Sequence, residues 1–311
     1  MLRGKAVDEL AARADGSAIW IRIAVEYIGK LRIKNHMGLE GALEHLPSSK
    51  ALAELYSKLF DKTCSDIAEN KELLQRALET LAIAQRPLTS EELAHAVFIN
   101  SEDGNITTLS ELEELAHSVD LFGLARPFVS ATNVGDGKDP QLSLVHQSLK
   151  ELILQAPPSN WCSTEKPSRR QQIVERMMEL NGLLLGRCVK YLLFKECEEA
   201  SLFSRFETSS DDAELLTIGS VFDDDGDQGP TDIALTGSKP SQDFNPFERG
   251  FGRFFTYAAS YWTCHFSNVS PERRPVLRLV KSLKPHGDFQ FMAEKTDHVK
   301  RNESVRGKRP S

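Results

Sequence analysis

The chain has 311 residues, and a prior of roughly 150 residues per domain predicts two structural units. Charged residues make up 27%, hydrophobic residues 40% and aromatic residues 8%, a mix that excludes a collagenous, disulfide-scaffold or wholly disordered chain. The formal net charge of -7 argues against a dedicated nucleic-acid-binding protein, and five scattered cysteines indicate a reducing compartment.

The first thirty residues predict two helices, the second beginning near Ser17. The start of the chain lacks the continuous apolar run of a signal peptide, and no later stretch is apolar enough to cross a membrane, so we expect a cytoplasmic chain. The first helix begins almost at the first residue, without a capping residue. This indicates truncation, which predicts an exposed apolar patch around Ile19, Trp20 and Ile23.

Residues 37–157 are predicted to form one unit whose first half is helical. Apolar residues recur at helical spacing in residues 52–60 and again in residues 73–81. Two further helices begin at capping-box sequences, in which Thr89 and Thr108 are each followed three residues later by Glu.

In the second half of this unit, the spacing of the apolar residues changes from helical to alternating. Residues 124–132 and 142–145 alternate as two strands around a turn rich in Gly and Asp, and a short helix follows over residues 147–154. Helices, a two-stranded wing and a final helix are the order of a winged-helix unit. We therefore expect a mainly α fold, with a winged-helix unit followed by an α-helical domain.

The rest of the chain is predicted to be helical in two parts. The first part is residues 158–206 and the second is residues 246–290. Between them, residues 207–245 form an acidic loop that we expect to be disordered, because eight acidic side chains occur near its start without any Lys or Arg. Residues 291–311 form a basic tail.

The common catalytic and metal-binding motifs are missing from the sequence. It contains neither the phosphate-binding P-loop nor the G-x-S-x-G sequence of hydrolases. The acidic run Asp223–Asp227 lacks the Gly and Glu that a calcium-binding EF-hand loop needs, and the cysteines lack zinc-site spacing. We expect a non-enzymatic chain with no metal, cofactor or small-molecule substrate.

His146 and Ser148 lie where the second predicted strand meets the next helix. A His–Ser pair is typical of nucleophilic catalysis, but the sequence places no orienting carboxylate beside it. A structural role is favoured, in which Ser148 caps the helix and His146 binds a backbone carbonyl. An unrecognised hydrolase stays as an alternative, and it requires a turnover that His146→Ala removes.

Charge argues against DNA binding by the winged-helix unit. Residues 70–155 hold six basic and thirteen acidic side chains, and the expected recognition helix, 109–119, carries three Glu and no basic residue. Such a surface repels phosphates. The alternative of a nucleic-acid-associated adaptor depends on the tail, and it requires salt-dependent DNA binding that is lost when residues 295–311 are deleted.

Four short motifs follow one another along the chain. They are Ala14–Ile21 (ADGSAIWI), Leu46-Pro47 with Leu52 and Leu55-Tyr56 after it, Arg86–Leu93 (RPLTSEEL) and Leu144–Leu149 (LVHQSL). Together they resemble the region after the nucleotide-binding module of NACHT-type STAND proteins, especially fungal NOD-like receptors with C-terminal ankyrin repeats. More loosely, Cys188–Leu192 and Tyr257–Trp262, followed by His265, resemble the helical stretch that leads into those repeats.

The resemblance covers residues 9–285 and implies a place in a longer protein. Residues 1–36 would end a NACHT-like module, residues 37–157 would be a winged-helix domain of the GPI inositol-deacylase type, and the later helices would form the linker. The implied partners are the NACHT NTPase module and the ankyrin-type repeats, or a second copy of the chain. Because the lipase motif is missing, no deacylase activity is implied.

We therefore expect a scaffold in signal transduction that links a nucleotide switch to a sensor. Arg86 and His146 are the residues most worth mutating, and Trp20 and Trp262 are expected packing anchors. The full set of structural or interface candidates is Trp20, Arg86, Pro87, His146, Ser148, Trp262 and His265.

Overall fold

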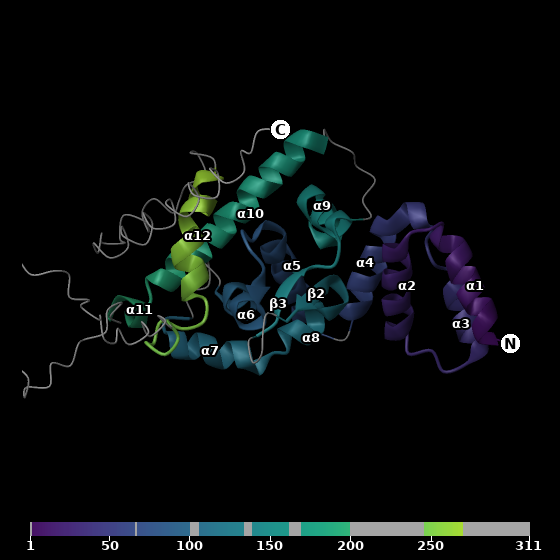
Figure 1. Cartoon of the computed structure of the whole chain (residues 1–311), viewed down its shortest axis with the longest axis horizontal. Coiled ribbons are helices and arrows are strands. Elements are labelled where there is room, and N and C mark those ends of the chain that lie inside the picture. The colour runs from purple at the N-terminus through teal and green to yellow at the C-terminus, as the bar shows by residue number, and fades with distance from the viewer. Residues whose placement is uncertain are drawn as a thin grey trace, which may run out of the picture.

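The computed structural model of the chain describes residues 2–65, 67–99, 106–133, 139–161, 169–199 and 246–269. The acidic loop at 207–245, the basic tail and the apolar pattern predicted after residue 270 lie outside the described residues. The described part is mainly helical and contains one small sheet (Figure 1). The expectation of a mainly α fold is confirmed.

The N-terminal end of the molecule is a group of helices that α4 connects to the centre (Figure 1). These helices are α1 (Leu2–Ala14), α2 (Ala18–Lys30), α3 (His36–Glu44) and α4 (Leu52–Thr63). The Ser17 side chain accepts a hydrogen bond from the Trp20 backbone N–H and caps α2, at the predicted start. The sequence analysis did not predict α3.

The expected exposed patch on α2 is wrong. Trp20 and Ile23 are fully buried, and Ile19 is half-buried, because α2 packs against α4. The Trp20 indole donates a hydrogen bond to the Pro47 carbonyl at 3.1 Å, so both its ring and its N–H are satisfied within the chain. The large apolar side chains exposed at this end are Val7, Val25 and Met37.

The central unit begins with α5 and ends with α9. Its elements are α5 (Ala68–Ile83), β1 (Leu88–Thr89), α6 (Ser90–Phe98), α7 (Leu109–Ser118), α8 (Leu121–Ala125), β2 (Val129–Thr132), β3 (Gln141–Leu144) and α9 (Gln147–Gln155). Both predicted capping boxes form, with Glu92 bonded back to Thr89 and Glu111 bonded back to Thr108.

The sheet has three strands in the order β1-β3-β2, all antiparallel, instead of the expected two. Leu88 of β1 pairs with Leu142 of β3, and both side chains are fully buried. A two-residue strand shows no alternation in sequence, so only its non-local pairing reveals it. The strand expected from residue 124 begins at Val129, because α8 and a 3-10 turn containing Pro127 precede it.

The C-terminal helices cover one side of the central unit. They are α10 (Arg169–Leu192), α11 (Lys195–Glu199) and α12 (Phe255–Ser267), and α12 lies along α10 (Figure 1). Leu184, Cys188 and Tyr191 of α10 belong to the same buried cluster as the apolar residues of α5 and α6. The hydrophobic core therefore continues across the predicted boundary at residue 157.

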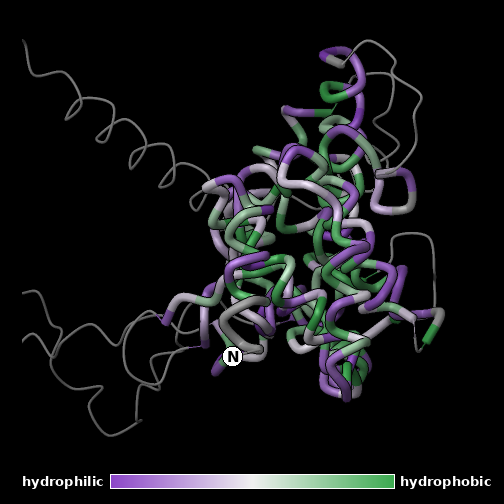
Figure 2. The backbone as a smooth tube through the Cα atoms, turned by 90° about the vertical axis from the view of Figure 1, so that its right-hand side faces the viewer, coloured by the Kyte–Doolittle hydropathy of each residue, from purple (hydrophilic) through white to green (hydrophobic). Residues whose placement is uncertain are grey.

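Hydropathy alternates along the helices, so that hydrophobic and hydrophilic stretches follow one another around the tube in Figure 2. This is the pattern of helices with one buried face. Within the described residues, no helix is both long enough and apolar enough to span a membrane.

Candidate interaction sites

A chain of buried polar contacts, which we call the joint, lies where α12 meets α5 and α10. The backbone N–H of Gln85, just after α5, donates to the Tyr257 hydroxyl at 3.1 Å. That hydroxyl lies 2.9 Å from Nε2 of His265, whose Nδ1 lies 2.8 Å from Oδ1 of Asn181. The Asn181 amide ends the chain by donating to the Met177 carbonyl at 2.7 Å. Tyr257 and His265 are fully buried, and Asn181 is nearly so.

The proton positions in the joint follow from this geometry. Because Nδ2 of Asn181 donates to a carbonyl, its Oδ1 is the acceptor, so Nδ1 of His265 carries the proton. Nε2 is then an acceptor and receives the Tyr257 hydroxyl proton. Burial lowers the pKa of His265 to about 4 and raises the pKa of Tyr257 above its usual value. The joint is therefore neutral at physiological pH.

Arg86 adds a charged contact beside the joint. Its guanidinium donates to both carboxylate oxygens of Glu92, at 2.8 and 2.6 Å, and its central carbon lies 5.4 Å from the centroid of the Tyr257 ring. The Glu92 side chain is only 7% exposed and also accepts the Thr89 backbone N–H at 2.9 Å. A bidentate ion pair and a cation–π contact thus fix α12 against the start of α6.

Two of the residues singled out from sequence, Arg86 and His265, both contact Tyr257 at the joint. Trp262 lies one turn before His265, half-buried between the two hydrophobic clusters of the C-terminal helices. Trp20 lies at the N-terminal end, in a separate environment. Sequence reasoning missed Tyr257 and Asn181 as site residues, although a lone Asn between Leu180 and Leu184 on a helix is the kind of signal that marks a buried polar contact.

Pro87 and His146 line a second feature, the basic pocket, a hollow of about 300 Å³ between the end of α5, β3 and the start of α9. Arg86 and Lys150 also face it, and no acidic side chain is among the described residues that line it. Because Arg86 is already paired with Glu92, Lys150 is the cation of this lining that has no ion pair among the described residues, and it is the group that could attract an anion.

His146 caps α9. Its Nδ1 accepts the Ser148 backbone N–H at 3.1 Å, so that nitrogen is unprotonated and also accepts the Ser148 hydroxyl proton at 2.8 Å. The expected roles were therefore wrong in detail: His146, and not Ser148, is the capping residue. Within the described part of the chain no carboxylate contacts His146, so the pair lacks the orienting group that nucleophilic catalysis requires.

Removal of this cap is expected to have a modest effect. His146→Ala should lower the free energy of unfolding by about 1 kcal/mol, the usual result of losing a capping side chain. His146→Asn, which can also accept the N–H, should restore most of the loss. Urea denaturation followed by circular dichroism measures both, and equal stability of wild type and His146→Ala would contradict the capping role.

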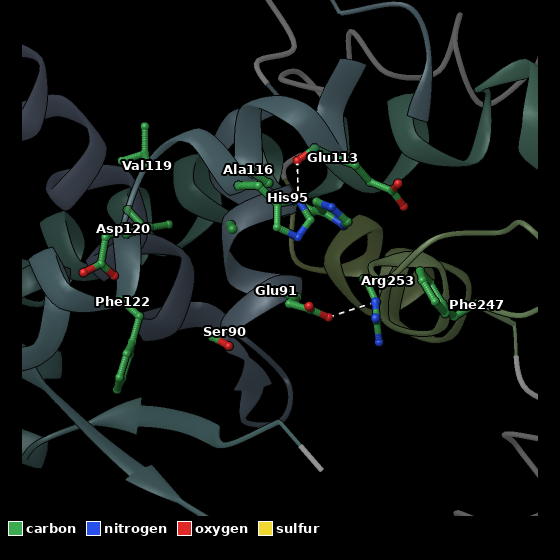
Figure 3. Close-up of a pocket in the computed structure, with 13 residues that line it drawn as sticks. Ser90, Glu91, His95, Glu113, Ala116, Val119, Asp120, Phe122, Phe247 and Arg253 are labelled. Carbon is green, nitrogen blue, oxygen red and sulfur yellow. Dashed lines mark hydrogen bonds and ion pairs between the residues drawn. The ribbon is translucent and has the colours of Figure 1, made fainter. Parts of the chain in front are cut away.

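A third feature, the acidic cleft, lies between α6, α7, α8 and the turn at residues 246–253 (Figure 3). Its volume is about 280 Å³. Glu91 of α6 is ion-paired with Arg253, Oε2 to Nε at 2.8 Å, and the Arg253 guanidinium lies 3.6 Å from the centroid of the Phe247 ring. On the facing helix, Nδ1 of His117 donates to the Glu113 carbonyl at 2.7 Å.

His95 lies at the base of the acidic cleft. The residue is 2% exposed, and its Nδ1 has no hydrogen-bond partner in the structure as described. Burial, and then the proximity of His117 and Arg253, lower the pKa of His95 to about 4. No residue of this cleft is among the sites predicted from sequence, because its lining comes from three stretches that lie far apart along the chain.

Metal and thiol chemistry receive no support from the described side chains. Among them, no three His, Cys, Asp or Glu residues are placed to hold a metal ion. Cys64, Cys188 and Cys197 are buried free thiols. Burial raises the pKa of Cys64 to about 11 and of Cys197 to about 12, and buried thiols of this kind are unreactive.

Comparison of the chain with protein-family models, with curated proteins and with solved structures finds no match. The class of protein and its partners therefore stay predictions that depend on the four motifs and on the three features described above.

Proposed function

We propose that the chain is a non-enzymatic scaffold of the NACHT-type STAND class, acting in the cytoplasm to couple a nucleotide-binding module to C-terminal repeats. The observation that carries this proposal is the joint. Units within one chain move relative to each other unless their interface is large and well packed. Here, a shared hydrophobic core and a fully bonded polar chain hold α10 and α12 on the central unit. A displacement of α10 and α12 is therefore expected to move the central unit with them.

A winged-helix assignment for the central unit supports the proposal. The order α5–β1–α6–α7–α8–β2–β3, with β1 and β2 both paired to β3, resembles the arrangement of that fold with the short helix α8 added before the wing. Its α7, in the position of a recognition helix, carries Glu111, Glu113 and Glu114. Hydrogen bonds from the Thr107 backbone lower the pKa of Glu111, which keeps that charge in place. Such a helix favours a protein neighbour over DNA.

The basic pocket is the surface at which we propose the partner module docks. It is open, it presents the Lys150 ammonium without an ion pair among the described residues, and it contains both residues, Arg86 and His146, that the motifs emphasise. Oppositely charged surfaces fix the orientation of two modules and accelerate their association.

The test uses the complete protein encoded by the full-length transcript, which should contain a P-loop module. Wild type is expected to change its oligomeric state between ADP and ATP, as measured by light scattering after size exclusion. Lys150→Glu, which reverses one charge of the basic pocket, should reduce that change by more than half. Glu151→Lys is the matched control, because Glu151 is the next residue of α9, is exposed, and does not line the pocket.

Either of two results would reject the proposal. The first is a transcript that encodes neither a nucleotide-binding module nor repeats. The second is a complete protein whose oligomeric state is the same with ADP and with ATP, or in which Lys150→Glu and Glu151→Lys change the nucleotide response equally.

A further inference from the structure

The lining of the acidic cleft has more acidic than basic side chains, so it disfavours anionic ligands. Glu91, Glu113 and Asp120 line it, against the single cationic side chain of Arg253. Of these, Glu91 is ion-paired with Arg253, and Asp120 accepts the Gly123 backbone N–H at the start of α8. Glu113 is the carboxylate of the lining for which no side-chain bond occurs within the described residues. A ligand that donates hydrogen bonds and carries positive charge is therefore favoured.

His95 is a second and independent sign of a ligand. A nitrogen that is buried without a partner destabilises the folded protein by about 1–3 kcal/mol, and such groups are rare unless they serve a function. His95 lines the cleft together with Glu113 and His117 of the facing helix, and Figure 3 labels His95 and Glu113. The lining of the cleft therefore contains a buried polar ring whose hydrogen bonding is incomplete in the described part of the chain.

The contacts of Arg253 indicate which kind of chemical group the cleft can bind. Its guanidinium already binds there, ion-paired to Glu91 on one side and stacked on Phe247 on the other. Phe122 supplies a further aromatic ring in the lining. Carboxylates and aromatic faces together are the groups that hold ammonium and guanidinium ions. A metal ion is not favoured, because the described residues hold no three-ligand cluster.

From this geometry, we propose that the acidic cleft is a binding site for a compact organic cation, an ammonium or guanidinium group, held by Glu113 and His95 beside Arg253. The cleft volume of about 280 Å³ lies at the lower end of the range for small-molecule pockets, which suits an amine or one basic side chain and excludes a nucleotide. The cation is either a free amine or a lysine or arginine side chain of a peptide. This site is separate from the coupling role proposed above.

The test is calorimetric titration of the whole chain with three probes: agmatine, a blocked Gly-Arg-Gly tripeptide and acetate. Agmatine or the tripeptide should bind, and acetate should not. Glu113→Gln, which removes the unpaired charge and keeps the shape, should weaken binding about tenfold, the effect of losing one charge-assisted hydrogen bond. Glu114→Gln is the matched control, because it removes the same charge from the adjacent, exposed position of α7 that does not line the cleft.

The outcomes separate the sources and decide the proposal. Tighter binding of agmatine identifies a free amine, and tighter binding of the tripeptide identifies a protein side chain. The proposal is overturned if neither cation binds, if acetate binds as well as they do, or if Glu113→Gln and Glu114→Gln have the same effect. Circular dichroism of both variants confirms that they are folded.

Discussion

Glu92→Ala is expected to lower the free energy of unfolding by about 3 kcal/mol or more, the typical result of removing one partner from a buried ion pair. The substitution leaves the Arg86 guanidinium, which is 26% exposed, without its only carboxylate partner among the described residues. It also removes the hydrogen bond from Glu92 to the Thr89 N–H that closes the capping box of α6. The loss of the ion pair and the loss of the capping hydrogen bond therefore both contribute to the effect of this one substitution.

Chemical denaturation of the chain, followed by far-ultraviolet circular dichroism, measures this loss. Glu72→Ala is the control, because the pair of Glu72 with Arg76 is a surface i,i+4 contact in which Glu72 is 68% exposed, and its removal should change stability by about 0.5 kcal/mol or less. Glu92→Gln, which keeps the cap, should fall between the two. If Glu92→Ala is no worse than Glu72→Ala, the contact between Arg86 and Glu92 does not stabilise the joint.

Acidification from pH 7 to pH 4 is expected to destabilise the protein strongly, through His265 and His95. Burial lowers the pKa of each to about 4, whereas a histidine in an unfolded chain titrates near 6.5. Between these values the unfolded state binds more protons than the folded state, so stability increases with pH across this window. The loss is complete at about pH 4 and amounts to about 3 kcal/mol for each ring.

The variant His265→Gln isolates one half of this effect. Glutamine cannot titrate, so the dependence of unfolding free energy on pH between 4 and 6.5 should become shallower by about half, although stability at pH 7 is also reduced. A wild-type protein equally stable at pH 4 and pH 7 would show that these imidazoles do not stay neutral on folding.

Local patterns predicted most of the helices and their starts. The capping boxes at Thr89 and Thr108 form as expected, since such a motif needs only two residues three positions apart and is complete within one turn of helix. The apolar faces of α4 and α5 are likewise buried. In contrast, β1 depends on a partner more than fifty residues away, so its two residues carry no period of their own.

The Trp20 prediction shows a different limit. Periodicity correctly indicates that a face of α2 is apolar, but it does not indicate what covers that face. The expected lost partner is replaced by α4, from the same chain. Amphipathic patterns predict burial, and only the three-dimensional arrangement assigns the neighbour.

The candidate sites were the least predictable part. Gln85 and Tyr257 are in direct contact although 172 positions separate them in sequence, and the acidic cleft is assembled from three separate stretches of the chain. Arg86 and His265 were singled out, yet for their motifs and not for a contact with the same tyrosine. The charge and chemistry of each residue follow from the local sequence, whereas the contacts between distant segments that form a site do not.

The bonded chain through Tyr257, His265 and Asn181 also sets the register of α12 on α10. Aliphatic side chains are interchangeable, so a purely apolar contact between two helices tolerates a slide of one turn, about 5.4 Å. In the joint, such a slide would break the two contacts that join different elements, Gln85 to Tyr257 and His265 to Asn181, whereas the contact between Tyr257 and His265 lies within α12. The apolar contacts hold α10 and α12 together, and the polar chain fixes the axial position of one helix relative to the other.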